Sequence, residues 1–499
     1  MISACGNSYK DSLSDKHIFY YIDAENGNDE YNGISEKYPF ASLEKINEMV
    51  LEPGTKVLFK SGTVYNGQLK PQGMGKAGNP IIFSKYGGEK KPRINGNGEF
   101  SATVHLYNLQ YFELHDLEIT NSGGDPQPGR RGIIIEAENL DVSRHIVLNN
   151  LFIHDVNGSM IKQKGGGSAI LWKNHGEETM TRFDSLIIEN CHIKNCTRNA
   201  INSSGYTDRD RWYPSTNVII RNNQIEGVPG DGIVPIGTDG ALIEYNLMRD
   251  CPDVLPFGEA AAGIWPWSSD NTLIQFNEVT GHKAKWDGQG FDSDWNCLNT
   301  TIQYNYSHDN YGGFLLVCND GENYSTSRNA GTVNTVVRYN LSVNDGIRPY
   351  KTARRGWFSP IMHLTGPVEN TLFLSNIFII PKKQKVEIDR TVVQMDNWGG
   401  PWPKESIFLK NIFMLEEEGK IQYGKGQRTI AWQNIIIHRG FDLIQDVSYE
   451  IPEWAKFQVN DLDKNFKVKL INAFLEDNEI MKKIIEELPT GKSYYEALD

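Results

Sequence analysis

A short unit in which an apolar residue stands three positions before an asparagine recurs through the middle of the chain. Its copies are Val147–Asn150, Ile187–Asn190, Ile220–Asn223, Ile243–Asn246, Ile274–Asn277, Ile302–Asn305, Val337–Asn340, Phe373–Asn376 and Phe408–Asn411. Coils of a β-helix, with a short core path and loops of variable length, produce such unequal spacing. The asparagines are expected to stack into a ladder in which each amide hydrogen-bonds to the neighbouring coils. A propeller would repeat at a steadier interval of about 40 residues.

The segments that flank the repeats predict caps. Residues 40–51 have apolar positions at helical spacing, with Ser42 near the start and Pro53-Gly54 beyond the end. A helix there would cover the open end of a solenoid. We expect a tether over residues 1–17, a β-helix over 18–445 and a C-terminal extension over 446–499. Helical character at Ile480–Leu488 predicts a short helical cap at the far end.

A second strand can be aligned after several of the asparagine units. Its copies are Gly232–Ile236, Gly263–Trp267, Gly290–Asp294 and Gly313–Val317. Strand alternation puts Asp292 and Asp294 on one face, and stacking of the copies places Trp265 beside Asp292 and Trp267 beside Asp294. The two indoles are candidate sugar-binding surfaces. Two neighbouring carboxyls should have coupled titrations, so that one acts as general acid and the other as nucleophile or base.

Other readings of this acidic stretch remain open. Asp287, Asp292 and Asp294 are candidate catalytic residues, but they could equally form a surface loop or bind calcium. His308 is a further catalytic candidate because it precedes the next strand, and Asp309 beside it is a candidate for substrate binding.

The remaining substrate-binding candidates lie in the neighbouring coils. They are Asp231 before an earlier copy of the second strand, Arg354 and Arg355 in a basic insertion, and His363 on a later strand. Arginines in that insertion suit a uronate or sulfate, through charge-assisted hydrogen bonds. The same insertion could also be a solvated loop.

The net charge of −13 argues against nucleic acid or an anionic membrane surface as partner. No nucleotide, flavin, haem or zinc pattern is present, so no cofactor is expected; calcium is the exception that the acidic loop at Asp23–Asp29 leaves open. That loop could also be ordinary turn chemistry. We expect a monomer.

The six cysteines include no CxxC pair. Most suit small buried positions in a solenoid core, and a disulfide between Cys297 and Cys318 is left open. The start of the chain, Met1–Asn7, looks like the end of a bacterial lipoprotein signal with Cys5 as the lipidated residue. No run of apolar residues is long enough to span a membrane. We therefore expect an exported protein that is attached to the outer membrane only through Cys5.

Several N-terminal motifs carry a resemblance to a known superfamily. They are Tyr20-Tyr21-Ile22-Asp23, Gly27-Asn28-Asp29, Pro53-Gly54, Gly62, Tyr65-Asn66-Gly67 and Gly78-Asn79-Pro80-Ile81. Together with the asparagine repeats, over about residues 18–440, they resemble secreted right-handed parallel β-helix proteins of the pectate-lyase-like, carbohydrate-active superfamily. The resemblance implies an all-β right-handed solenoid and polysaccharide processing. The adjacent Asp-Asp, Gly-His-Gly and Arg-Ile-Lys set of polygalacturonases and the Arg-x-Pro-x-x-Arg motif of pectate lyases are absent.

Three functions fit these observations. The first is a glycoside hydrolase that degrades a polysaccharide or oligosaccharide with paired carboxylates on the outer face of the β-helix. The second is a lyase that acts on a uronate-containing glycan by β-elimination, with His308, Lys283 or Lys285 as base. The third is a surface lipoprotein that binds glycans without catalysis.

Overall fold

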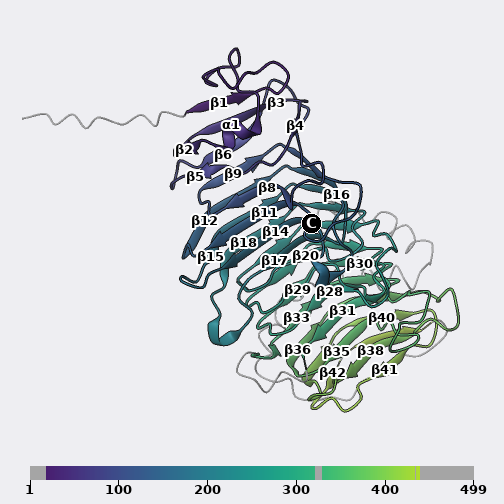
Figure 1. Ribbon diagram of the computed structural model, residues 1–499. Helices are drawn as coiled ribbons and strands as arrows, with labels where there is room; N and C mark the ends of the chain where they lie inside the picture. The colour runs from purple at the N-terminus through teal and green to yellow at the C-terminus, as the bar shows by residue number, and fades with distance from the viewer. Residues whose placement is uncertain (1–17, 321–328, 433, 439–499) are drawn as a thin grey trace, which may run out of the picture.

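The computed structural model describes residues 18–320, 329–432 and 434–438. Successive short strands coil into one column, and every pairing between the named strands is parallel (Figure 1). Three faces of the column are sheets. The chain is therefore a parallel β-helix in which each coil adds a strand to each face in turn.

The first face is a 16-stranded sheet. In spatial order its strands are β1 (Phe19–Ile22), β3 (Lys56–Lys60), β6 (Ile81–Tyr86), β9 (Phe112–His115), β12 (Val142–Asn149), β15 (Arg182–Glu189), β18 (Ser215–Arg221), β22 (Leu242–Glu244), β25 (Leu273–Gln275), β29 (Thr301–Gln303), β33 (Val336–Arg338), β36 (Val368–Leu374), β39 (Lys404–Leu409) and β42 (Ile430–Trp432). Two short strands lie off this path, β21 (Thr238–Asp239) and β32 (Thr332–Val333).

The second face is a 13-stranded sheet. Its strands are β4 (Val64–Asn66), β7 (Arg93–Asn95), β10 (Glu118–Asn121), β13 (Phe152–Val156), β16 (His192–Cys196), β19 (Gln224–Glu226), β23 (Leu247–Arg249), β26 (Glu278–Thr280), β30 (Tyr306–His308), β34 (Leu341–Val343), β37 (Ile377–Ile380), β40 (Ile412–Leu415) and β43 (Ile435–His438).

The third face is divided into two five-stranded sheets. The first comprises β8 (Ala102–Tyr107), β11 (Arg131–Glu138), β14 (Ser168–His175), β17 (Asn199–Ser204) and β20 (Ile233–Val234). The second comprises β28 (Gln289–Ser293), β31 (Gly313–Cys318), β35 (Met362–Thr365), β38 (Thr391–Asp396) and β41 (Lys420–Gln422). Isolated parallel bridges from Ile233 to Ile264 and from Ile264 to Phe291 join the two sheets. β24 (Ala260–Ala261) and β27 (Trp286–Asp287) form a two-stranded sheet of their own.

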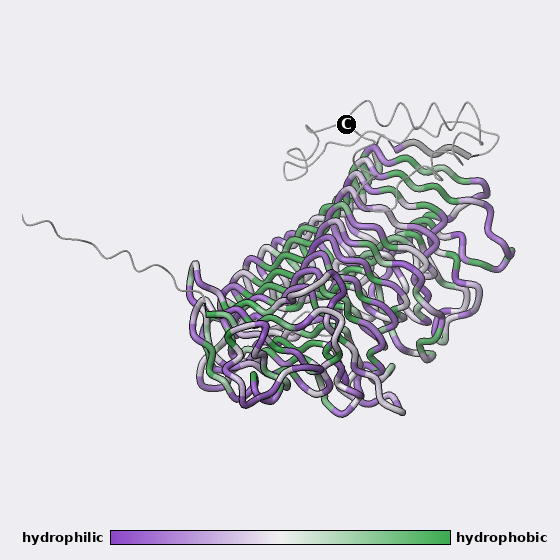
Figure 2. Tube along the Cα trace, turned by 90° about the horizontal axis from the view of Figure 1, so that it is seen from above, coloured by the Kyte–Doolittle hydropathy of each residue, from purple (hydrophilic) through white to green (hydrophobic). Residues whose placement is uncertain are grey.

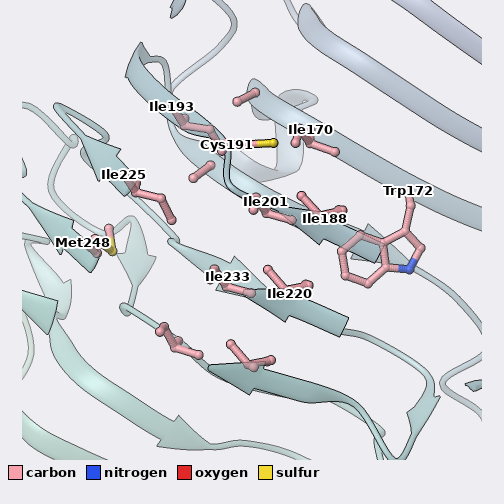
Figure 3. Packing of buried hydrophobic residues seen from close by; sticks show 14 of the residues in the cluster. Ile170, Trp172, Ile188, Cys191, Ile193, Ile201, Ile220, Ile225, Ile233 and Met248 are labelled. Atoms are coloured by element: carbon pink, nitrogen blue, oxygen red, sulfur yellow. The ribbon is translucent and has the colours of Figure 1, made fainter. Parts of the chain in front are cut away.

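Aliphatic side chains fill the interior in columns, because parallel in-register coils repeat the same inward positions. Ile170, Ile201 and Ile233 are paired partners on β14, β17 and β20, and all three have 0% exposure. Figure 3 shows them beside a second column that includes Ile188 and Ile220. Figure 2 shows hydrophobic residues recurring at the same points of successive coils.

The asparagine ladder is present, but it begins later than the sequence pattern suggested. Each Oδ1 accepts from the backbone N–H and side-chain amide of the preceding rung, as between Asn277 and Asn305 at 2.9 and 3.0 Å. The rungs are Asn223, Asn246, Asn277, Asn305, Asn340, Asn376, Asn411 and Asn434.

The predicted rungs Asn150 and Asn190 were wrong by one position. Both are outside the ladder at left-handed corners, with φ of 53° and 56°. Cys191 occupies the ladder position of its coil, where its N–H donates to Asn223. The corner favours asparagine because its short polar side chain tolerates positive φ. Asparagine is therefore found both at the corner and in the buried ladder, and the two positions give the same sequence pattern.

The N-terminal capping helix is shorter than the predicted 40–51. α1 spans Leu43–Asn47, and the hydroxyl of its N-cap, Ser42, accepts from Lys45 N–H at 3.1 Å. The predicted last turn is instead strand β2 (Val50–Leu51), which pairs with β5 (Gln72–Gly73). Pairing with β5 satisfies backbone groups that the end of a helix would leave unbonded.

Cys297 and Cys318 are both buried and free, so the disulfide that the sequence left open does not form. Among the described residues, no helix has the length and apolar character needed to cross a membrane. Cys5, the tether and the predicted helical segment 480–488 lie outside the described residues.

Candidate active site

The three predicted aspartates lie on the third face, where its two five-stranded sheets adjoin. Asp287 is the last residue of β27, Asp292 lies within β28, and Asp294 follows that strand. Asp287 has a φ of 59° and Gly288 follows with 80°, so the chain turns sharply between the two strands. Left-handed residues of this kind recur at the corners of the coils, so the conformation marks a corner of the column.

Burial raises the pKa of all three aspartates, but the three differ in their exposure to solvent. Asp292 is 3% exposed and its Oδ1 has no hydrogen-bond partner among the described residues. Burial and the charges of Asp294 and Asp287 raise the pKa of Asp292 well above its usual range. Asp287 and Asp294 are partly exposed. Asp292 is therefore the buried carboxyl in which the protonated form is favoured, and the other two are the carboxyls that solvent can reach.

Asp287 titrates near neutrality. Burial, together with the charge of Asp294, raises the pKa of Asp287 to about 7, against an opposing effect of the Arg348 guanidinium. Arg348 is 2% exposed and donates to the main-chain carbonyls of Asp287 and Phe358. The arginine therefore fixes the backbone that carries the carboxyl while leaving the carboxyl itself unpaired with a cation.

Asp294 is held by two donors. Its Oδ1 accepts from the Cys318 thiol at 2.9 Å and from the backbone N–H of Trp295 at 2.6 Å. Burial raises the pKa of Asp294, and these two hydrogen bonds and the charge of Lys162 lower it again. Burial and the nearby Asp294 raise the pKa of Cys318 well above its usual range, so the thiol keeps its proton and remains a donor.

A buried ion network spans the three coils that precede these aspartates. Arg198 is fully buried and pairs with Asp231 at 2.8 Å and with Glu259 at 3.0 Å. Burial acts to raise the pKa of Asp231, but the charges of Lys162 and Arg198 lower it overall. Asp231 is thus a charged structural residue, and its Oδ1 also accepts from the indole N–H of Trp265 at 3.2 Å.

Trp265 is placed as predicted but is not an open sugar-binding surface. Since Ile264 pairs with Phe291 in parallel register, Trp265 stands level with Asp292. Its ring is 5% exposed, and Lys162 Nζ lies 5.0 Å from the ring centroid. The alignment gave the correct register, but it could not show that the segment around Lys162 covers the indole.

Trp267 is partly exposed and lies edge-on to the ring of Trp295, with 6.1 Å between the centroids. It packs against the small apolar group formed by Val234, Ala262 and Trp265. Of the two predicted indoles, Trp267 is therefore the one accessible beside the aspartates.

A small pocket adjoins Asp287 on the side of the later coils. Trp286, Asp287, Arg348, Phe358, His363 and Trp398 are among its lining residues. His363 is 3% exposed and shares Asp396 with Arg355, its Nε2 lying 2.9 Å from the carboxylate. Burial lowers the pKa of His363, so it is neutral.

Only one of the predicted arginines of the basic insertion contacts residues of the pocket region. Arg355 forms an ion pair with Asp396, behind His363. Arg354 and Lys351 are exposed. Arg355 thus supports the pocket through His363, whereas the position of Arg354 does not place it at the aspartates.

His308 and Asp309 are not part of the site. His308 ends β30 on the second face, whereas the aspartates lie on the third. Its ring hydrogen-bonds Asp309 at 2.7 Å and Glu278 at 3.3 Å. Burial opposes a charge on His308, yet these two carboxylates raise its pKa to about 9. The prediction that His308 reaches the cleft was wrong because the chain turns a corner of the column between β30 and β31.

The ion pairs of His308 should make stability depend on pH. A histidine with a raised folded-state pKa stabilises the fold fully below about pH 6.5, and the effect is lost as pH rises through about 9. We expect His308→Gln to lower the unfolding free energy by about 1–3 kcal/mol at pH 6 and by much less at pH 9.5. Denaturant unfolding at the two pH values measures this.

His192→Gln is the matched control for that experiment, because His192 lies on the same face and pairs with one carboxylate, Glu226 at 3.1 Å. Its loss of stability at pH 6 should be smaller. An equal loss at both pH values for His308→Gln would show that packing, and not charge, accounts for the effect.

Two groups of acidic residues are candidate cation sites. Glu136, Glu138 and His175 converge on the outer surface, but the Lys173 ammonium lies 2.6 Å from Glu136, and a bound cation would have to displace it. In the N-terminal loop, Asp23 accepts hydrogen bonds from the backbone of its own turn, which is the turn chemistry that the sequence left open. Asp29 accepts from the backbone N–H groups of Ala41 and Ser42, just before α1.

Sequence reasoning missed Arg198, Lys162 and Cys318. Arg198 and Cys318 contact carboxylates through the stacking of coils, at separations of 33, 61 and 24 residues. The alignment of the second strand was off by one residue at this coil: it put Val317 level with Asp294, whereas β28 and β31 pair Asp292 with Leu316 and Ser293 with Val317, which brings Cys318 level with Asp294. No motif marks Arg198 or Lys162.

Comparison with known proteins supports the fold. Residues 168–347 match the family model of the right-handed beta helix region. The chain is 29% identical over 422 residues to lacto-N-biosidase of Bifidobacterium longum subsp. longum, a match that covers 65% of this chain and 26% of that protein. The chain therefore spans about a quarter of the length of this relative.

Crystal structures of GH136 lacto-N-biosidase from Eubacterium ramulus have the same fold. The selenomethionine derivative superposes with a TM-score of 0.63 at 24% identity, over 85% of this chain and 68% of that one. The native protein gives 0.61 at 23% identity, over 84% and 68%. The chain thus has the right-handed parallel β-helix fold, as its sequence indicated.

Proposed function

We propose that this protein is a glycoside hydrolase whose catalytic carboxyls are Asp287 and Asp294. The observation that carries the proposal is the group of three aspartates with different protonation and exposure, beside a pocket lined by aromatic residues. Glycoside hydrolysis needs one protonated and one ionised carboxyl on either side of the scissile bond. The similarity to a lacto-N-biosidase supports the same class of reaction.

Asp287 suits the general acid. With a pKa of about 7, much of it is protonated at neutral pH, and its position in the pocket gives it access to a leaving-group oxygen. Asp294 suits the nucleophile or base, because the donors on its Oδ1 stabilise the carboxylate form.

Asp292 takes a different role from the one first expected. The sequence suggested the pair Asp292 and Asp294, but Asp292 is the member of the group with almost no exposure. A neutral acid between two reacting carboxyls adds no negative charge to the site. We propose that it keeps the region around Asp287 apolar, so that the pKa of Asp287 stays high enough for a general acid.

Two of the three bases first considered for a lyase, His308 and Lys285, are not suited to that role. His308 lies on another face and carries a proton at neutral pH, since its pKa is about 9. Lys285 forms an ion pair with Asp253. β-Elimination needs an unprotonated base that can reach the C5 proton of a uronate.

Product analysis distinguishes the reactions. The protein is incubated with uronate polymers, with other plant and host glycans and with oligosaccharides that carry terminal lacto-N-biose, and the products are weighed by mass spectrometry. We expect cleavage with gain of one water, and release of lacto-N-biose as the first candidate product. Unsaturated products without added water would identify a lyase. Binding without any product would identify a glycan-binding protein.

The Cys318 thiol should set the acidic limb of the pH–rate profile. Cys318→Ala removes the donor on Asp294, so the pKa of Asp294 should rise and the acidic limb should move up by about half a pH unit or more. Cys318→Ser retains a donor and should restore most of the wild-type profile. The measurement is kcat/KM against pH. Coincident profiles for the alanine variant and the wild type would rule out this role.

A further inference from the structure

An exposed group of aromatic rings lies beside the pocket, at the loop that precedes β24. Phe257 is 67% exposed, and its ring centroid is 5.9 Å from that of Tyr350. The ring of Tyr311 lies 5.8 Å from Tyr350 on the other side. Phe257, Tyr311 and Tyr350 are called the aromatic shelf below. They come from three separate loops, so the folded column brings them together.

A lysine holds the shelf in place. Lys285 Nζ lies 5.6 Å from the ring centroid of Phe257 and 5.0 Å from that of Tyr350, and it pairs with Asp253 of the same loop as Phe257. The Lys285 side chain is 13% exposed. An ammonium shared between two aromatic faces and a carboxylate orders the exposed ring of Phe257 before any ligand arrives.

The shelf is continuous with the pocket at Asp287. Tyr311 immediately precedes Gly312, and Tyr350 follows Arg348 by two residues; Gly312 and Arg348 both line the pocket. Arg348 also donates to the main-chain carbonyl of Asp287. A ligand that extends out of the pocket past Arg348 therefore meets the shelf.

We propose that the aromatic shelf, through the exposed ring of Phe257, binds a second sugar ring of the substrate, adjacent to the sugar that is cleaved beside Asp287. The inference rests on the proposed glycoside hydrolase function. Tyr311 and Tyr350 are partly buried and meet their neighbours edge-on, so they support Phe257, whose exposed and ordered ring suits the apolar face of a sugar. A contiguous apolar patch of this kind marks an interaction site, and its continuity with the pocket favours a glycan over a second copy of the chain.

The test is binding of two probes of different length by a protein that cannot turn them over. Asp294→Asn serves as the parent, and calorimetry gives Kd for lacto-N-biose and for a tetrasaccharide that carries it at the non-reducing end. Adding Phe257→Ala should weaken tetrasaccharide binding about tenfold and change disaccharide binding less than about twofold. Phe257→Tyr should retain the affinity of the parent.

Val254→Ala is the matched control, because Val254 is 53% exposed in the same loop and is not one of the shelf rings. The shelf is overturned if Phe257→Ala weakens both probes equally, if it weakens neither, or if the parent does not bind the tetrasaccharide. A changed self-association of Phe257→Ala in ultracentrifugation, with unchanged affinities, would assign the shelf to contact between copies.

Turnover by the wild-type chain separates this inference from the proposed function. If the wild type hydrolyses a probe, but Phe257→Ala does not weaken tetrasaccharide binding more than disaccharide binding, the shelf is refuted and the hydrolase is retained. A length-dependent loss, with no hydrolysis of either probe by the wild type, would retain the shelf and refute the hydrolase.

Discussion

Replacing Asp287 or Asp294 with asparagine is expected to lower kcat/KM at least about 1,000-fold while the fold is retained. Each change removes one of the two accessible carboxyls, and neither carboxyl carries a salt bridge that stabilises the described part of the chain. Release of a chromophore or of the natural product measures the activity of each variant. Circular dichroism and a melting curve show whether the fold is retained.

The matched control is Asp270→Asn, since Asp270 is an aspartate of a neighbouring coil that pairs with Arg209 at 2.7 Å outside the group. It should retain activity. Near-normal turnover in both Asp287→Asn and Asp294→Asn would remove the assignment of these two residues, and a large loss confined to Asp292→Asn would return the role to the residue first predicted.

Removing one rung of the asparagine ladder is expected to cause the largest loss of stability. Asn305 accepts from the backbone and side chain of Asn277 and donates to Ile274 O and to Asn340 Oδ1, all in the buried interior. Asn305→Ala leaves buried groups on both neighbouring coils unsatisfied. Each costs about 1–3 kcal/mol, so the unfolding free energy should fall by about 3 kcal/mol.

An exposed asparagine column supplies the control for this experiment. Asn299 donates to Asn271 at 2.9 Å on the surface and has a φ of 59°. Asn299→Gly keeps the left-handed backbone at low cost and should change stability by less than about 1 kcal/mol. Equal midpoints of chemical unfolding for the two variants would show that the buried ladder contributes no more than a surface contact.

The coil pattern could be predicted because it repeats. Asn223 and the later rungs stand at one fixed point of each coil, so their spacing marked the solenoid and the pairing of Trp265 with Asp292 followed from alignment. Asn150 and Asn190 misled the interpretation because the left-handed corner and the buried ladder are adjacent and both select asparagine.

The site could be predicted only where its residues are close in sequence. Asp287, Asp292 and Asp294 are close in sequence, and their group was found. Which of them is accessible depends on the loops that cover the strand, and no local pattern records this. His308 was misplaced because sequence distance does not show where the column turns a corner.

The ladder and the in-register strands have a consequence for how such proteins diversify. They fix the height and rotation of each coil, and the loops add residues only outside this framework. Loops such as those carrying Phe257 and Lys162 can therefore lengthen, shorten or change composition while the carboxyls keep their spacing. Under the proposed function, substrate preference depends on the loops and reaction chemistry on the column, so the glycan that is accepted can change while the catalytic groups stay in place.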